Sequence, residues 1–231
     1  RGVVYGLSSN PTTAGSKVST SGTTGTYTVS LTGLSNGTLY HYRAYAINSV
    51  GTSYGSDSVF TTDSIAPTVT TSTITSITST GASSGGNVTD AGGGTISERG
   101  VVYSTSSNPT TADTKVIDGA ATTGSFSSSL TGLSQGTTYH VRAYAINGVG
   151  TSYGSDSSFT TLDIPTVITS TFNTITATSA NTGGNVTSNG GASLSERGVV
   201  YQSESNYSRY KSYRRRNNYR FIFKFINGLN K

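Results

Sequence analysis

The chain has 231 residues, including 29 Gly, 15 Tyr and 7 Phe, and it contains no Cys, Met or Trp. The absence of Cys excludes disulfides and thiolate–metal sites, and there is no run of about 18 apolar residues that would predict a membrane-spanning helix. The net charge of +5 is confined to the end of the chain. Residues 1–201 carry seven Lys/Arg and nine Asp/Glu, a net of −2, whereas residues 202–231 carry eight and one, a net of +7.

An internal repeat of domain size organises the chain. The pentapeptide Arg-Gly-Val-Val-Tyr occurs at residues 1–5, 99–103 and 197–201, each copy 98 residues after the last. A period this long is a whole domain rather than one turn of a solenoid. Abundant Thr, Val, Ile and Tyr, interrupted by Gly, Ser and Asn, favour an all-β class.

The repeat predicts tandem immunoglobulin-like β-sandwiches, one complete and two incomplete. We expect residues 1–62 to be the C-terminal part of one unit, residues 63–161 a complete unit, and residues 162–201 the N-terminal part of a third. Residues 202–231 form an aberrant basic tail. Because the chain has no Met, we interpret it as part of a longer protein, with any signal peptide upstream.

Within the complete unit, short runs of alternating residues are separated by Gly-rich turns, as in a sandwich. In chain order the predicted strands are Thr68–Thr75, Gly81–Thr89, Ile96–Ser104, Gly124–Leu130, Thr137–Ile146 and Gly154–Thr161. Alternation along the longest strand predicts a core-facing set made of Tyr139, Val141, Ala143 and Ala145. The outward set is then His140, Arg142, Tyr144 and Ile146.

The segment Leu-Thr-Gly-Leu-Ser-Gln-Gly-Thr-Thr-Tyr at residues 130–139, running into Arg-Ala-Tyr-Ala-Ile-Asn, resembles the fibronectin type III pattern. The resemblance covers about 200 residues. It implies a tyrosine corner, in which a Tyr hydroxyl bonds back to the backbone, at Leu133 and Tyr139 and again at Leu34 and Tyr40. The chain departs from the family in lacking the core Trp of the second strand. The segment Ser-Glu-Arg-Gly-Val-Val-Tyr resembles repeat arrays on large surface proteins of Bacteroidetes-type bacteria.

Three interpretations compete for the basic tail: a nucleic-acid-binding arm, a membrane-surface segment, or a reading-frame artefact. Back-translated and read one base later, Ser208–Arg216 yields Ala-Asp-Thr-Lys-Val-Ile-Glu-Gly-Gly, nearly the sequence of residues 112–120. The match continues in the same frame to the counterpart of Leu133. Our hypothesis is therefore that the tail beyond roughly Asn206 is a frameshifted third repeat.

The candidate chemistry is sparse. His41 and His140 occupy the same position in two repeats, and one His per unit lacks the further ligands that a metal or general-base site requires. Asp57, Asp156 and Asp90 lie in Gly-rich turns, where turn capping is favoured over Ca²⁺ binding. We predict no catalytic residues, no cofactor and no metal.

Two sets of aromatic and basic residues are candidates for binding surfaces. Arg43 and Arg142 lie beside Tyr45 and Tyr144, which favours cross-strand packing or a cation–π contact over a ligand-facing patch. Tyr54 and Tyr153 are expected to be exposed and able to stack on sugars, although a platform without Trp is weak.

These observations predict a non-enzymatic, extracellular or cell-surface repeat module of a bacterial protein, acting as a spacer, stalk or adhesion segment. The alternative is an accessory module of an extracellular enzyme that binds carbohydrate or protein. The expected partners are neighbouring repeats and protein or polysaccharide at the cell surface, with no nucleic acid and no membrane span in the chain.

Overall fold

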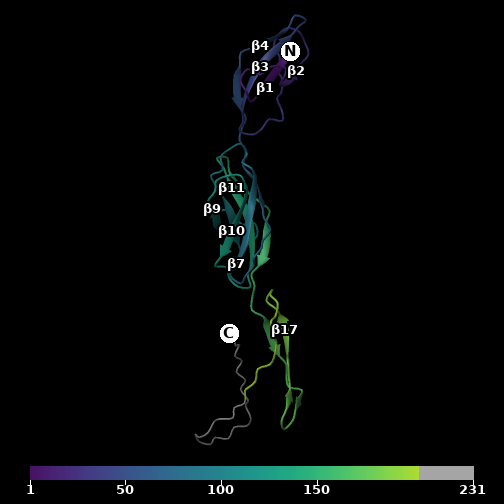
Figure 1. The fold of residues 1–231 in the computed structure, drawn as a ribbon, viewed down its shortest axis with the longest axis vertical. Coiled ribbons are helices and arrows are strands. Elements are labelled where there is room, and N and C mark those ends of the chain that lie inside the picture. Colours follow the sequence, from purple (N-terminus) through teal and green to yellow (C-terminus); the bar gives the residue numbers. More distant parts are fainter. Residues whose placement is uncertain (203–231) are drawn as a thin grey trace. The chain divides into compact units, whose positions relative to one another are not determined.

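The computed structural model describes residues 1–202, which form strands and turns (Figure 1). No helix occurs in that range, so none there could cross a bilayer. The basic segment 203–231 and its frameshift interpretation lie outside the described residues. The chain divides into two compact units, the first being Arg1–Thr161 and the second beginning at Leu162.

Residues 63–161 form a β-sandwich of two antiparallel sheets, labelled in part in Figure 1. One sheet has three strands in the order β10-β7-β6, and the other has the order β12-β11-β8-β9 with β13 also paired to β11. The predicted all-β, sandwich fold class is confirmed. The strands are β6 (Thr68–Thr71), β7 (Gly81–Asp90), β8 (Glu98–Ser104), β9 (Thr114–Asp118), β10 (Gly124–Thr131), β11 (Thr138–Ile146), β12 (Thr151–Tyr153) and β13 (Ser157–Thr160).

Two strands of the sandwich escaped prediction, and two were predicted too long, since the predicted strand Gly154–Thr161 is confined to Ser157–Thr160. β9 was missed because Thr-Lys-Val-Ile-Asp is short and charged, and it forms a strand by pairing with β8 at the sheet edge. β12 has three residues between two glycines and pairs with β11. The predicted strand from Thr68 ends at Thr71, after which Thr75 makes an isolated bridge to Ser83.

The core lies between the two sheets. Val141, Ala143 and Ala145 of β11 are completely buried, as the alternation predicts. No Trp fills the centre, and the sheets meet closely instead: a Cβ added at Gly86 of β7 would overlap the methyl group of Ala143 and touch the ring of Phe126. The volume that a core Trp would fill is therefore occupied by the methyl group of Ala143 and the ring of Phe126, which the missing side chain of Gly86 allows to approach.

The three copies of Arg-Gly-Val-Val-Tyr adopt different structures. In β8 the two valines, Val101 and Val102, are both 0% exposed. In residues 197–201 the same pentapeptide forms no strand, and Val199 and Val200 are 45% and 56% exposed. Within residues 1–202 this third copy pairs with no strand, whereas β8 pairs with both β9 and β11. The same five residues therefore differ in structure as their pairing differs.

Residues 1–62 form one five-stranded sheet, and here too a segment forms a strand only where its pairing partner is present. Residues 25–32 correspond to β10 in the repeat but form no strand, since β10 pairs only with β7 and residues 1–62 contain no equivalent of β7. The inner face of this sheet is open: Ala44 is exposed where its equivalent, Ala143, is buried. The strands are β1 (Gly2–Gly6), β2 (Ser16–Ser19), β3 (Leu39–Ile47), β4 (Thr52–Tyr54) and β5 (Ser58–Thr61).

Residues 162–202 carry two short strand pairs, β14 with β17 and β15 with β16. Most of their apolar side chains are exposed, including Ile168 and Ile175. The predicted boundary after Thr161 coincides with the division between the two compact units. The other predicted domain boundaries stay predictions. The strands are β14 (Thr166–Thr169), β15 (Thr174–Ile175), β16 (Ala180–Asn181) and β17 (Gly184–Ser188).

Two serines face the core of the sandwich with unsatisfied hydroxyls. Ser84 of β7 and Ser128 of β10 are directly paired across the strands, and both are buried. Neither Oγ atom has a hydrogen-bond partner. A buried hydroxyl without a partner costs roughly 1–3 kcal/mol in desolvation.

We therefore expect Ser128→Ala to stabilise the sandwich by about 1 kcal/mol, because the substitution removes an unsatisfied group with little change in volume. Thermal unfolding should shift upward by roughly 4–8 °C. Ser127→Ala, on the exposed face of the same strand, serves as the control and should change stability by less than about 0.5 kcal/mol. A destabilised Ser128→Ala variant would show that this hydroxyl is satisfied in solution.

Candidate functional site

The corner implied by the fibronectin type III resemblance lies at the start of β11. Tyr139 accepts a hydrogen bond on its hydroxyl from the backbone N–H of Ser134 at 3.1 Å, and Leu133 is buried in the core beside it. In residues 1–62, Tyr40 makes the same bond with Ser35 N at 3.1 Å. Leu34, the counterpart of Leu133, is half-buried there, where the facing sheet is absent. The two tyrosine hydroxyls are thus used in hydrogen bonds to the backbone of the same chain, which is a structural role.

The arginine of the pentapeptide organises the loop after β9. Arg99 is 5% exposed, and its Nε atom donates to Asp118 Oδ2 at 2.7 Å. One terminal nitrogen of Arg99 also reaches three backbone carbonyls, and the guanidinium lies 5.0 Å from the Phe126 ring centroid. The carbonyls belong to Thr122, Thr123 and Gly124. Sequence reasoning treated this arginine only as a repeat marker and missed its role.

The glycine of the pentapeptide explains why Tyr144 is buried. Tyr144 was predicted on the outward face with mixed exposure, but it is 0% exposed. It pairs with Gly100, and a Cβ on Gly100 would lie 3.1 Å from the Tyr144 ring, so the absent side chain makes room for the ring. Tyr45 lies over Gly2 in the same way in residues 1–62. The prediction was wrong because the cross-strand glycine is not visible from one strand's alternation.

A small polar cluster closes over this ring. Glu98 Oε1 accepts hydrogen bonds from Lys115 Nζ at 2.8 Å and from the Tyr144 hydroxyl at 2.7 Å. The bond from Lys115, and then the bond from Tyr144, lower the pKa of Glu98 below its usual value. Burial, together with the bond to Glu98, raises the pKa of Tyr144 above its usual value. The cluster is therefore a structural one: an ion pair between Lys115 and Glu98, with the hydroxyl of buried Tyr144 as a second donor to the carboxylate.

Each histidine is paired with an aspartate sixteen residues later. His140 Nδ1 lies 2.8 Å from Asp156 Oδ2, and His41 Nδ1 lies 2.7 Å from Asp57 Oδ2. Asp156 also accepts a hydrogen bond from the backbone N–H of Asn108, whose φ is +55°. The pair thus fixes a strained loop. The recurrence of the same spacing in both repeats was a signal that sequence reasoning did not use.

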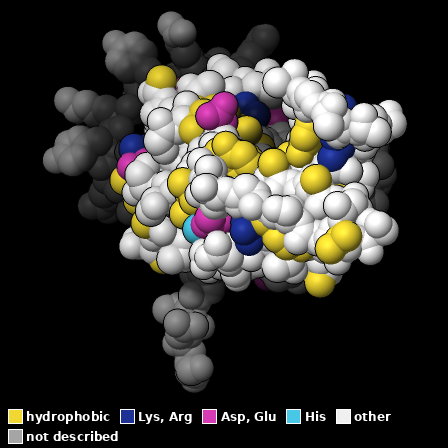
Figure 2. Space-filling view, turned by 90° about the horizontal axis from the view of Figure 1, so that it is seen from above, with side chains coloured by type: hydrophobic (Ala, Val, Ile, Leu, Met, Phe, Trp, Pro, Cys, Tyr) yellow, Lys and Arg dark blue, Asp and Glu magenta, His cyan; other side chains and the backbone are white. Residues whose placement is uncertain are grey.

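The third aspartate acts as a turn cap: Asp90 Oδ1 accepts a hydrogen bond from Gly92 N at 2.8 Å. In residues 1–202, no three His, Cys, Asp or Glu side chains gather in a way that could hold a metal ion. The face seen in Figure 2 carries few charged side chains, and these are dispersed.

The arginines predicted to stand beside tyrosines do stack, but on different partners. Arg142 lies over the ring of Tyr153 at 4.7 Å from its centroid, and its Nε donates to Gly154 O at 2.9 Å. Arg43 lies over Tyr54 at 4.6 Å in the same arrangement. The Tyr153 hydroxyl bonds to Thr111. Tyr54 and Tyr153, which were expected to be exposed, are only half-buried, with an arginine over one ring face and the hydroxyl hydrogen-bonded. Their stacking on sugars stays a prediction.

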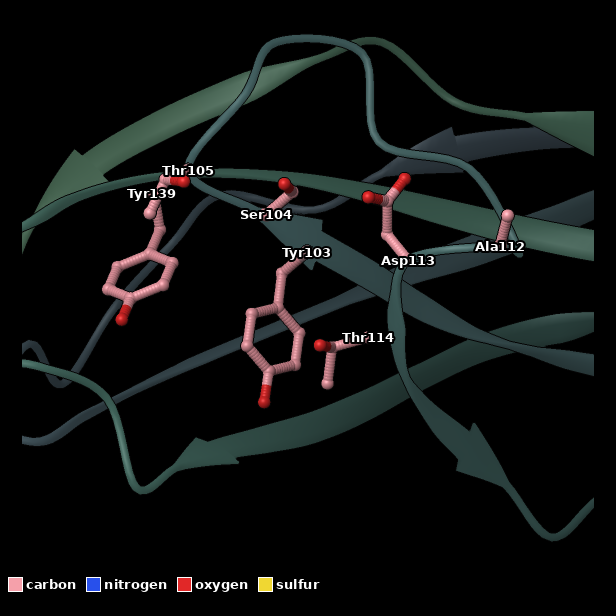
Figure 3. Close-up of a pocket in the computed structure, with 7 residues that line it drawn as sticks. All are labelled: Tyr103, Ser104, Thr105, Ala112, Asp113, Thr114 and Tyr139. Carbon is pink, nitrogen blue, oxygen red and sulfur yellow. The ribbon is translucent and has the colours of Figure 1, made fainter.

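One end of the sandwich carries a hollow of about 540 Å³ that is a candidate site for a ligand (Figure 3). The rings of Tyr103 and Tyr139 point the same way along one side of it, and Thr114 lies beside Tyr103. Asp113 stands on the opposite loop, where its carboxylate accepts a bond from Thr110 N at 2.8 Å. The remaining lining residues are Ser104, Thr105 and Ala112. The hollow is wide and has no convergent set of free polar groups.

Comparison with known proteins adds little to this picture. No protein-family model matches the chain, and no curated protein matches it in sequence. The sensor domain of the anti-sigma factor RsgI4 from Pseudobacteroides cellulosolvens is similar over 43% of this chain and 98% of that one, with 18% identity and a TM-score of 0.32. The FN1–FN3 domains of chicken CNTN1 are similar over 69% of this chain and 55% of that one, with 18% identity and a TM-score of 0.33.

Domains of titin are similar over 54% of this chain and 40% of that chain, with 18% identity and a TM-score of 0.30. Likeness at this level says nothing about function. The assignment of the sandwich fold rests on the strand order and sheet pairing described above.

Replacing the buried arginine tests its structural role. We expect Arg99→Ala to destabilise the sandwich by roughly 2–4 kcal/mol, because Asp118 and three carbonyls lose a charged donor. The matched control is Arg197→Ala, at the same position of the exposed third copy of the pentapeptide, which pairs with no strand within residues 1–202 and should leave chemical denaturation unchanged. Equal effects of the two substitutions would contradict this role.

The lowered pKa of Glu98 predicts an acid-dependent loss of stability. Since the folded-state pKa lies below the usual value of 4.5, the unfolded chain binds more protons under acid conditions. The contribution of Glu98 is therefore present above about pH 4.5 and is lost as the pH falls through the folded-state pKa. Urea denaturation as a function of pH should show a shallower acid slope for Glu98→Gln and an unchanged slope for the exposed counterpart, Glu196→Gln. An unchanged slope for Glu98→Gln would refute the assignment.

Proposed function

We propose that this chain is a non-catalytic spacer segment of an extracellular or cell-surface bacterial protein. The observation that carries the proposal is where the linkers join the sandwich. The entering linker contacts the sandwich at Asn147, which follows β11, and Thr161 bonds to Thr137, which precedes β11. At about 3.3 Å per residue, the nine residues of β11 separate these two points by roughly 30 Å. Each repeat therefore adds length.

The polar groups support the same proposal. Side chains that could have built a reactive site are engaged within the fold: the histidines with aspartates, the arginines with carbonyls and rings, and the corner tyrosines with backbone amides. Catalysis requires an activated group with room for a substrate next to it. A Thr-rich sandwich of low charge, whose histidines and arginines are bonded within the fold, suits a passive extracellular array. Nucleic acid is not among its proposed partners.

An accessory role in polysaccharide binding is the second candidate, and the hollow beside Tyr103 is the observation that favours it. An aromatic ring next to hydroxyls and a carboxylate is the kind of surface that a sugar ring stacks on and hydrogen-bonds to. The hollow is wide, and the Tyr139 hydroxyl is already hydrogen-bonded to Ser134 N in the tyrosine corner. Both observations favour the spacer over this candidate.

Titration of the isotopically labelled chain with soluble polysaccharide fragments separates the two. The spacer proposal predicts no saturable amide shifts around Tyr103 and Thr114 up to about 1 mM ligand, a concentration at which even weak sites fill. Saturable shifts that disappear in Tyr103→Ala, but persist in Tyr201→Ala at the exposed third copy, would replace the spacer with a binding module.

A further inference from the structure

The linker between residues 1–62 and the intact sandwich is gripped on its N-terminal side. Thr62 Oγ1 donates to Ser35 O at 2.6 Å and accepts from Thr38 N at 2.9 Å. The carbonyl of the first linker residue, Asp63, accepts from Gly37 N at 3.0 Å. The turn at residues 35–38, part of the tyrosine corner, therefore holds the start of the linker.

The same linker is gripped on its C-terminal side by the intact sandwich. Ile65 N donates to Gly92 O at 2.8 Å, and Ile65 O accepts from Asn147 Nδ2 at 2.7 Å. Asn147 is 4% exposed, and its Nδ2 also donates to Ala91 O at 2.9 Å. Its Oδ1 accepts from Val149 and Gly150, so the amide joins the loop after β11, the turn after β7 and the linker.

Two glycine turns bring the backbones of the repeats into direct contact. A Cβ added at Gly93 would overlap the carbonyl of Asn36, and a Cβ added at Gly37 would overlap the carbonyl of Gly93. Both glycines have positive φ, +77° at Gly93 and +54° at Gly37. Only glycine combines this conformation with so close an approach.

We propose that this junction is a fixed joint, in which the corner of one repeat and the Gly92–Gly93 turn and Asn147 of the next hold the linker from both sides. Only Ser64 separates the gripped residues Asp63 and Ile65, and buried Pro67 has a restricted φ. Adjacent domains in one chain ordinarily move relative to each other. The joint removes that freedom, and its stiffness can be measured whether or not the array serves as a spacer.

The second linker carries the same kinds of bond. Thr161 Oγ1 donates to Ser134 O at 2.7 Å, as Thr62 does to Ser35. Asp163 N donates to Gly190 O at 2.8 Å, as Ile65 does to Gly92. Each of these two bonds lies within one compact unit of the chain.

Residual dipolar couplings of the full 231-residue chain test the joint. A fixed joint predicts that one alignment tensor fits the amides of residues 1–62 and 63–161 together. Asn147→Ala should break this agreement, while Asn48→Ala should preserve it. Asn48 accepts the same loop bonds, from Val50 and Gly51, at the equivalent position of residues 1–62.

Insertion of Gly-Ser-Gly after Ser64 provides a second variant that leaves the contacts inside each repeat intact. It should give two independent tensors with unchanged amide positions for β8 and β11, even if Asn147→Ala unfolds the sandwich. The proposal would be overturned if the wild-type chain needed two alignment tensors, or if the tensor of residues 1–62 were near zero. It would also be overturned if the insertion variant retained a single tensor.

Discussion

The hydrogen bonding of β11 to three other strands is the constraint on which the rest of the structure depends. β11 pairs with β8, β12 and β13, and its inner face supplies the buried centre of the sandwich. The corner tyrosine lies at its start and Asn147 directly after its end. Because the histidine and the stacked arginine also lie on β11, a single strand sets the position of the core, the loops and both linkers.

The polar chemistry of the chain is directed inward, toward its own backbone. Arg99 bonds to three carbonyls, His140 to an aspartate that holds a loop, and Asn147 to the linker. A disulfide-free sandwich with glycine in place of a core Trp obtains rigidity from such bonds, since each one fixes a segment that few apolar contacts hold.

The sequence predicts the parts of this fold that depend on one strand alone. Alternation along residues 137–146 identifies the core face of β11, and the period of 98 identifies the sandwich as the repeating unit. The burial of Tyr144 depends on a glycine in the neighbouring strand, so single-strand alternation cannot show it. The His–Asp pairs and the role of Arg99 likewise depend on contacts between distant segments, although the repeated spacing of sixteen residues hinted at the former.

Strand pairing decides which copies of the repeated pentapeptide form strands. Hydrogen–deuterium exchange of the three copies of Arg-Gly-Val-Val-Tyr, measured at low concentration in one chain, tests this most directly. We expect strong protection at 99–103 and exchange at the unprotected rate at 197–201. Equal protection of these two identical segments would contradict it.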